Sequence, residues 1–241
     1  MIKTIYFSIF LYLLAGCGDQ EDRYEVITKM RGIGVQTSPF APIASTSDLP
    51  QTVTLTFYIA APKGSSTPTQ FENYNDTGSP TSLVTPALTP TLSNTQSLGN
   101  LTIFEITAQT VLPTADKLTF NEKGIATLRY GIKATLDSDE EIIVGNILIH
   151  AATSEVLNWT AHSVTIESIT PSTSFDLNGS IANDNEKYKI SWWAPAGKIK
   201  NSSALTTKIE ELPSGPQTIL FTARGMTSGS FAWMTSDIVV P

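Results

Sequence analysis

The sequence predicts an all-β protein with two tandem antiparallel β-sandwiches. Apolar and polar residues alternate in successive short segments, these segments lack helical periodicity, and Asn, Asp, Gly and Pro stand between them as turn signals. The 241-residue chain is long enough for two cores of roughly 100 residues each. We therefore expect two sandwiches that follow one another along the chain.

The first residues have the pattern of an export signal. Lys3 is the only charge before Cys17, and the stretch 5–14 between them is largely apolar. A transmembrane helix needs about 20 apolar residues, and this run is shorter. The pattern predicts a secretory signal peptide over residues 1–16.

The end of this run carries the only cysteine of the chain, Cys17. The cysteine is preceded by Leu14, Ala15 and Gly16, and these four residues resemble the lipobox of bacterial lipoproteins. The resemblance implies cleavage before Cys17, lipidation of its sulfur, and acylation of its new amine by a fatty acid such as palmitate. Residues 17–24 would then form a lipidated tether that anchors the protein to a membrane. The alternative is an ordinary secreted protein with a chance cysteine near its cleavage site.

Residue 18 and the overall charge bear on location and partners. Gly18 follows the cysteine, and by similarity to the sorting rules of Gram-negative lipoproteins it favours the outer membrane of the cell envelope over the inner one. Removal of residues 1–16 changes the formal charge from −7 to −8, because Lys3 is lost, and no basic cluster follows. Nucleic acid is therefore a poor partner class. Cys17 is the only cysteine, so with Cys17 lipidated no disulfide can form. We also expect no cofactor.

The strands of the first sandwich follow from the alternation. In residues 52–61 one face is apolar, which predicts a half-buried strand, and residues 101–107 repeat the pattern. Residues 64–100 differ, because Gly, Ser, Thr, Pro and Asn dominate them. We expect an irregular insertion there, with a short strand near 82–85 and partial packing of scattered apolar residues that include Phe71 and Tyr74.

A β-hairpin is the clearest local prediction. Residues 125–136 and 142–151 are strand-like runs, and the five polar residues 137–141 between them predict the turn. The pattern breaks over 151–162, so we place the boundary between an N-terminal unit, 25–160, and a C-terminal unit, 161–241. In the second unit we expect strands at 164–169, 188–193, 205–209, 217–223 and 230–240.

Part of the second unit resembles bacterial Ig-like and PKD-like domains. The resemblance covers roughly residues 163–241 and rests on a Trp-x4-Gly-x-Ile arrangement, two threonines and a Pro-Ser-Gly turn before a strand, at Trp192 or Trp193, Gly197, Ile199, Thr206, Thr207 and 212–215. The acidic Gly-Asp-Gly turn of PKD domains is missing, so the resemblance implies an Ig-like sandwich and not the narrower family. Residues 27–33 are similar to the first strand that follows the lipid cysteine in some Ig-bearing lipoproteins.

Few residues suggest chemistry. His150 and His162 are the only imidazoles, neither has a second ligand at a metal-site spacing, and we interpret both as surface residues at strand ends. A Ser-His-Asp triad is not excluded by spacing, but no Gly-x-Ser-x-Gly motif occurs. The acidic runs 137–141 and 184–186 lack the order of a calcium loop, so we interpret them as solvated turns and predict no metal site.

The aromatic residues are the candidate contact sites. Strand parity predicts that Trp192 fills a core while Trp193, beside two lysines, meets a partner, a glycan or the first sandwich. In the last strand, Phe231 and Trp233 are out of phase with Ile238, which predicts a β-bulge between them. The residues that we single out for contact with a protein or glycan are Trp193, Trp233, Phe71 and Tyr74.

These observations favour a non-catalytic, lipid-anchored protein of the cell envelope that serves adhesion, scaffolding or binding of a protein or glycan. The alternative is a lipid-anchored hydrolase or solute-binding lipoprotein that acts on envelope carbohydrate or peptide. A deep pocket converging on either histidine would favour the alternative.

Overall fold

The structure is a computed structural model, and it describes residues 26–44, 51–74, 88–136, 139–152, 154–170, 174–183 and 185–241. The predicted leader, the lipobox, Cys17, the tether 17–24 and the expected strand near 82–85 lie outside the described residues. The strands are β1 (Arg31–Ser38), β2 (Thr52–Pro62), β3 (Gln70–Asn73), β4 (Thr91–Leu98), β5 (Leu101–Val111), β6 (Ile125–Leu136), β7 (Asp139–His150), β8 (Ser163–Thr170), β9 (Phe175–Ala182), β10 (Tyr188–Trp193), β11 (Lys198–Ile199), β12 (Thr206–Glu210), β13 (Gly215–Gly225) and β14 (Phe231–Val240). Two short 3-10 helices, Ala115–Lys117 and Glu155–Asn158, accompany them.

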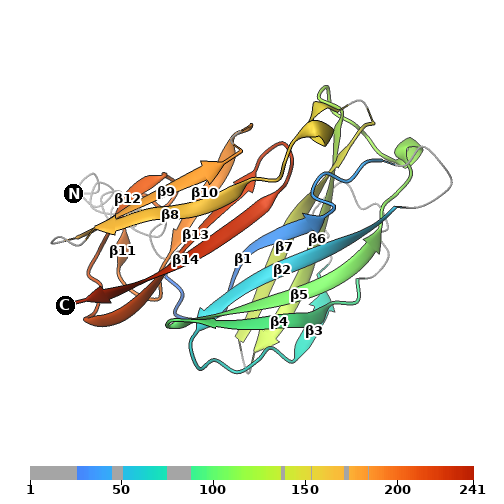
Figure 1. The fold of residues 1–241 in the computed structure, drawn as a ribbon. Coiled ribbons are helices and arrows are strands. Elements are labelled where there is room, and N and C mark those ends of the chain that lie inside the picture. The colour runs from blue at the N-terminus through green and yellow to red at the C-terminus, as the bar shows by residue number, and fades with distance from the viewer. Residues whose placement is uncertain are drawn as a thin grey trace, which may run out of the picture.

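The strands form two antiparallel sandwiches with the same strand order (Figure 1). In the first sandwich the sheet β1-β2-β5-β4 faces the sheet β3-β6-β7, and in the second the sheet β8-β9-β12-β11 faces β10-β13-β14. If each set of seven strands is lettered A to G, both sandwiches read ABED and CFG, which is the order of a constant-type Ig domain. The predicted all-β fold of tandem Ig-like sandwiches is confirmed. Among the described residues, no helix is long and apolar enough to cross a membrane.

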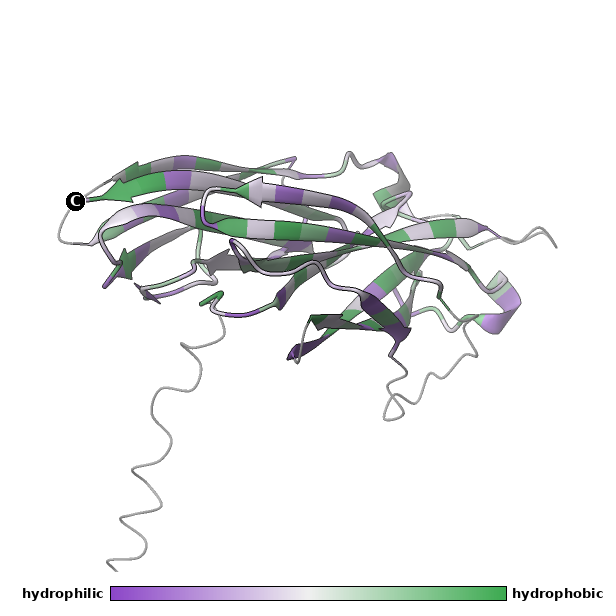
Figure 2. Cartoon of the chain, turned by 90° about the horizontal axis from the view of Figure 1, so that it is seen from below, coloured by the Kyte–Doolittle hydropathy of each residue, from purple (hydrophilic) through white to green (hydrophobic). Residues whose placement is uncertain are grey.

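Apolar and polar residues alternate along many of the strands (Figure 2), and the apolar faces of the strands are buried in the cores. The inward residues of β2, Val53, Leu55, Phe57, Ile59 and Ala61, are fully buried in the first core, as the alternation predicts. In the second core Trp192 is fully buried and its ring stacks on Phe221 with centroids 4.3 Å apart. Gly179 on β9 leaves room for both rings, since a Cβ there would lie 2.8 Å from a carbon of Phe221.

The predicted irregular insertion 64–100 is partly wrong. It contains β3 and β4, which form the outer edges of the two sheets of the first sandwich. Both strands are polar and mostly exposed because an edge strand with a solvated outer face needs little apolar alternation. Hydropathy therefore could not separate them from a loop.

Two boundaries and one strand differ from the sequence-based expectation. The first strand begins at Arg31 and not at residue 27. The sequence analysis does not predict β9, because its sequence, FDLNGSIA, alternates weakly. The hairpin is confirmed, with Leu136 opposite Asp139. Its acidic residues 139–141, however, belong to β7 and not to the turn.

The predicted bulge in the last strand is wrong. The pairing of β13 with β14 runs without a register shift from Gly215 opposite Val240 to Arg224 opposite Phe231. Ile238 faces the core of the second sandwich, whereas Phe231 and Trp233 face the first sandwich. The apparent conflict in phase arises because both faces of β14 are covered by protein.

Candidate functional site

The two sandwiches meet through an apolar cluster that we call the junction cluster. It joins residues of β1, β2 and β5 in the first sandwich to residues of β10, β13 and β14 in the second. Its buried members are Ile27, Ile33, Tyr58, Ala60, Leu101, Ile103, Leu220 and Phe231, and Leu98, Trp193 and Trp233 pack partly buried against it. The outer faces of two sheets are thus removed from solvent where they meet.

Close packing fixes the centre of the junction. The ring centroids of Tyr58 and Phe231 lie 5.4 Å apart, and those of Tyr58 and Trp233 lie 6.0 Å apart in an edge-on arrangement. Gly34 on β1 is required here, because a Cβ at this position would lie 2.1 Å from Phe231 Cε2. Burial and the nearby Glu105 carboxylate raise the pKa of Tyr58, so this phenol stays neutral.

Hydrogen bonds close one margin of the junction. The Asn100 backbone N–H donates to Thr218 Oγ1 at 2.9 Å, and the Thr218 N–H donates back to Asn100 Oδ1 at 2.8 Å. The Asn100 amide also donates to Gln217 Oε1 at 3.1 Å. The β4–β5 turn of the first sandwich is therefore fastened to β13 of the second.

The segment after the predicted tether is fastened to the second sandwich. Val26 forms an isolated parallel bridge with Ala194, and the Ile27 N–H donates to the Ala194 carbonyl at 2.7 Å. Ile27 itself is fully buried in the junction cluster. The chain thus enters the described fold at the junction, in contact with both sandwiches.

Both histidines are buried, so their interpretation as surface residues is wrong. His150, the last residue of β7, is 0% exposed, and His162, just before β8, is 6% exposed. Their positions at strand ends were expected, but the second sandwich folds back over them there. Sequence alone could not show this, because the covering residues come from the distant β13–β14 turn.

His162 belongs to a chain of hydrogen bonds that ends at Glu186. Its Nδ1 lies 2.6 Å from Ser230 Oγ, and its Nε2 lies 3.0 Å from the Ala223 carbonyl oxygen. Ser230 Oγ lies 2.8 Å from Ser228 Oγ, whose hydroxyl donates to Glu186 Oε1 in a short hydrogen bond. We call His150, His162, Glu186, Ser228 and Ser230 the elbow cluster.

This arrangement does not have the order of a Ser-His-acid triad. The nitrogen of His162 that an acid would orient instead contacts a backbone carbonyl, and the serine nearest the ring is only 4% exposed. Glu186 accepts from the Thr227 and Ser228 N–H groups at 2.5 and 2.9 Å and thereby shapes the β13–β14 turn. The contacts of the elbow cluster hold the backbone of the β13–β14 turn. The Ser230 hydroxyl is buried and not accessible to a substrate.

The acidic residues also serve local structure. Glu141 Oε1 accepts from the Gly32 N–H at 2.9 Å, and Glu140 pairs with Lys133 at 3.3 Å. No group of three or more His, Cys, Asp or Glu in the described residues could hold a metal ion.

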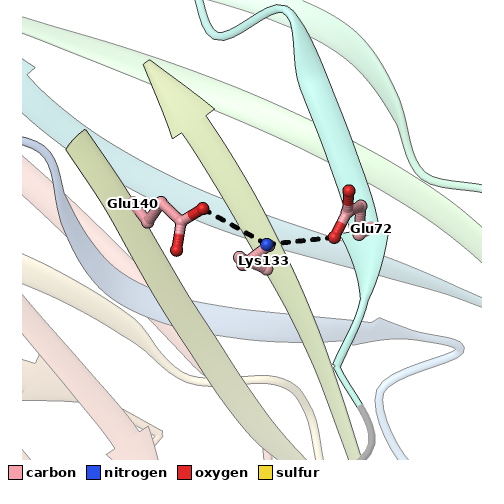
Figure 3. A network of polar contacts seen from close by, with 3 residues as sticks. All are labelled: Glu72, Lys133 and Glu140. Carbon is pink, nitrogen blue, oxygen red and sulfur yellow. Dashed lines mark hydrogen bonds and ion pairs between the residues drawn. The ribbon is translucent and has the colours of Figure 1, made fainter. Parts of the chain in front are cut away.

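The outer face of the sheet β3-β6-β7 carries a partly exposed ion network. Lys133 on β6 lies between Glu72 on β3, at 3.0 Å, and Glu140 on β7, at 3.3 Å (Figure 3). Beside it in the register stands Ile142, whose exposed fraction is 46%. Tyr74 lies over Gly131 on the same sheet, since a Cβ at Gly131 would lie 3.1 Å from Tyr74 Cδ1. We call this surface the β3-β6-β7 face.

The four predicted contact aromatics are thus divided among three places. Trp193 and Trp233 lie at the junction, where the Trp193 indole donates to Thr222 Oγ1 at 3.3 Å. Tyr74 lies at the β3-β6-β7 face, and Phe71 packs from β3 against the first core. Sequence reasoning missed Ile142 as a surface residue, because it begins an apolar run whose next residue, Ile143, is buried.

Comparisons with known proteins find remote structural likeness. No protein-family model matches the chain, and no curated protein matches it. Among solved structures, the mouse nectin-like molecule 4 ectodomain (Ig1–Ig3) is similar at 12% identity and a TM-score of 0.27, over 87% of this chain and 63% of that one. Fibronectin(III)-like modules of Clostridium thermocellum CbhA are 14% identical over 86% of this chain and 93% of theirs, with a TM-score of 0.30. The C-terminal fragment of intimin, solved with the intimin-binding domain of its translocated receptor, is 13% identical over 87% of this chain and 64% of that one, with a TM-score of 0.24.

Proposed function

We propose that this chain is a non-catalytic, lipid-anchored protein of the cell envelope that binds a protein partner through the β3-β6-β7 face. The observation that carries the proposal is the use of the two histidines. Both are enclosed in the elbow cluster, so the groups best suited to acid–base chemistry near neutral pH hold the fold together. What the chain exposes are sheet faces, strand edges and turns.

The β3-β6-β7 face is suited to contact because it combines an apolar residue with fixed charges. Ile142 is 46% exposed, and the ion network beside it offers two carboxylates around one ammonium. The four-stranded sheet of the first sandwich is partly covered by the second sandwich through the junction cluster. The second sandwich also contacts β7 at Leu148, near the end of that strand, but Ile142 near its start stays 46% exposed. A rigid sheet face that stays open is the surface best placed for a partner.

The anchor part of the proposal rests on the resemblance of residues 14–17 to a lipobox. The outer membrane is the proposed location because Gly18 follows Cys17. Since the chain enters the described fold between the two sandwiches, the tether would hold the junction, and not only the first sandwich, near the bilayer. Both sandwiches would then lie close to the membrane.

Crosslinking on intact cells, followed by identification of partners, tests the proposal. We expect Ile142→Asp to lose the main crosslinked partner, because a charge replaces the exposed apolar contact. Leu205→Asp on the second sandwich is the matched control, since Leu205 is 42% exposed, and it should keep that partner. A point substitution is preferable to deletion of the predicted insertion 64–100, because the deletion would remove both β3 and β4.

Three outcomes would contradict the proposal. An unchanged partner profile in Ile142→Asp would exclude the β3-β6-β7 face as the contact. Lipid labelling that persists in Cys17→Ser would exclude the anchor. Hydrolysis of envelope carbohydrate or peptide by the purified chain, abolished by His150→Gln, would favour the enzymatic alternative.

A further inference from the structure

The connection between the two sandwiches begins and ends at a buried histidine. His150 closes β7 and His162 immediately precedes β8, and the chain contains no other histidine. Both rings approach the β13–β14 turn, residues 226–230. A Cβ at Gly229 in this turn would lie 3.3 Å from Leu148 Cγ, so the turn also packs directly on β7. This region is therefore one of the contacts that hold the second sandwich against the first.

The protons of the His162 chain can be counted. A carbonyl only accepts, so Nε2–H donates to Ala223, and in the neutral ring Nδ1 must accept the Ser230 hydroxyl proton. The Ser228 hydroxyl donates to Glu186, which leaves the 2.8 Å contact between the two serine oxygens without a proton. A proton on Nδ1 lets each hydroxyl donate one step toward Glu186 and fills all three contacts. The charge of Glu186 is thereby matched to His162.

His150 has no such match. Its Nδ1 lies 3.4 Å from Ser154 Oγ, and its Nε2 is buried without a hydrogen-bond partner in hydrogen-bonding geometry among the described residues. The Ser228 backbone and the charge of Glu186 are near enough to raise its pKa, but burial outweighs them and lowers it. Burial likewise lowers the pKa of His162, against the Ala223 carbonyl and Glu186. Two imidazoles thus share one carboxylate.

Other charged groups around the cluster do not supply a second counter-charge. Arg224 on β13 donates to the Asn146 carbonyl at 2.7 Å and adds positive charge. The Tyr188 ring packs against His162 with centroids 4.7 Å apart. The remaining titratable groups of the described segments that adjoin the cluster are exposed, namely Glu122, Lys123, Glu155, Lys187 and Lys189.

We propose that the elbow cluster is an acid-sensitive latch between the two sandwiches. The first proton is held by His162 and Glu186, and the second, on His150, is an uncompensated buried charge that releases the β13–β14 turn from β7. The sign follows from linkage. Because the pKa of His150 is lower in the folded state than its ordinary value of 6.5, the latch is fully closed above that pH and opens as the pH falls from 6.5 through the folded-state value of His150.

The test follows the inter-sandwich distance and the imidazole signals together. Spin labels are attached through Thr127→Cys and Thr206→Cys, one exposed strand position in each sandwich, in the full chain with Cys17→Ser. Between about pH 7.5 and about pH 4.5 we expect the distance distribution to broaden reversibly while circular dichroism stays constant. Only two imidazole resonances exist to assign, and both should titrate below 6.5.

Three variants separate a latch from general acid sensitivity. His150→Phe should keep a narrow distribution across this range, and His150→Gln serves the same purpose if the aromatic variant does not fold. Glu186→Gln should move the opening upward by about one pH unit, because the closed form then binds protons more weakly while the open form binds them as before, so that less acid is needed to open it. Opening of both His150 variants at the wild-type pH, an unshifted midpoint in Glu186→Gln, or loss of circular dichroism together with opening in the wild type would each overturn the proposal.

Discussion

Asn100 shows how a single side chain can hold two sandwiches together. Its amide and its backbone N–H reach both the backbone and the side chain of Thr218, and each hydrogen bond crosses from one sandwich to the other. Thr218 is 1% exposed, so these groups are shielded from water. A buried polar group that loses its partner costs more than the bond itself contributes, because its desolvation is no longer compensated.

At this scale we predict that Asn100→Ala lowers the free energy of unfolding by about 1–3 kcal/mol. Chemical denaturation monitored by tryptophan fluorescence measures the change. Asn94→Ala is the control, because Asn94 is exposed and the hydrogen bonds of its amide stay within the first sandwich: it donates to Glu105 Oε1 at 3.2 Å and accepts from the Thr95 N–H at 2.9 Å. That variant should stay within about 0.5 kcal/mol of the wild type. Equal effects of the two substitutions would show that the Asn100 contacts do not join the sandwiches.

At the scale of an element, β14 is a strand with two apolar faces. Ile238 faces its own core, Trp233 faces the other sandwich, and Val239 is 76% exposed beyond the junction. The last strand of an isolated sandwich would be expected to alternate apolar and polar residues. Both faces of β14 are therefore apolar because one packs in its own core and the other packs against the first sandwich.

Three substitutions in β14 should accordingly have three different results. Ile238→Asp should unfold the second sandwich or destabilise it by about 2 kcal/mol or more, because it buries a charge. Trp233→Ser should leave both sandwiches folded but weaken the junction. Val239→Asp should change the stability by less than about 0.5 kcal/mol. Denaturation curves followed by amide signals from each sandwich distinguish these results, and a bulged β14 would give a different ranking.

The same strands show how far sequence patterns lead. Alternation located β2, β5, β6, β7, β10 and β14 because each has at least one face in a core, and it placed Trp192 inside and Trp193 outside that core correctly. The polar edge strands β3 and β4 had no such pattern. The predictions of a bulge in β14 and of an exposed His150 were wrong for one shared reason, since each treated the sandwiches as independent. His162 is covered by Ala223, Tyr188 and Ser230 of its own sandwich, which are distant from it in sequence. A surface that one sandwich buries on the other leaves no local periodicity in the sequence.

At the scale of the whole molecule, the junction cluster, the Asn100 contacts and the elbow cluster act at different positions along one interface. Together with the bridge between Val26 and Ala194 they restrict rotation of one sandwich against the other. A two-sandwich unit of fixed shape would present the β3-β6-β7 face at a defined angle to the tether. The account therefore depends first on the rigidity of this unit near neutral pH.

Residual dipolar couplings of backbone amides in the isotopically labelled Cys17→Ser chain, at about pH 7.5, measure this rigidity most directly. The account predicts that one alignment tensor fits the couplings of strands β1–β7 and β8–β14 together, with the two sandwiches oriented as in the structure. Two tensors of different magnitude would show that the sandwiches move independently, and that result would contradict both the junction and the latch.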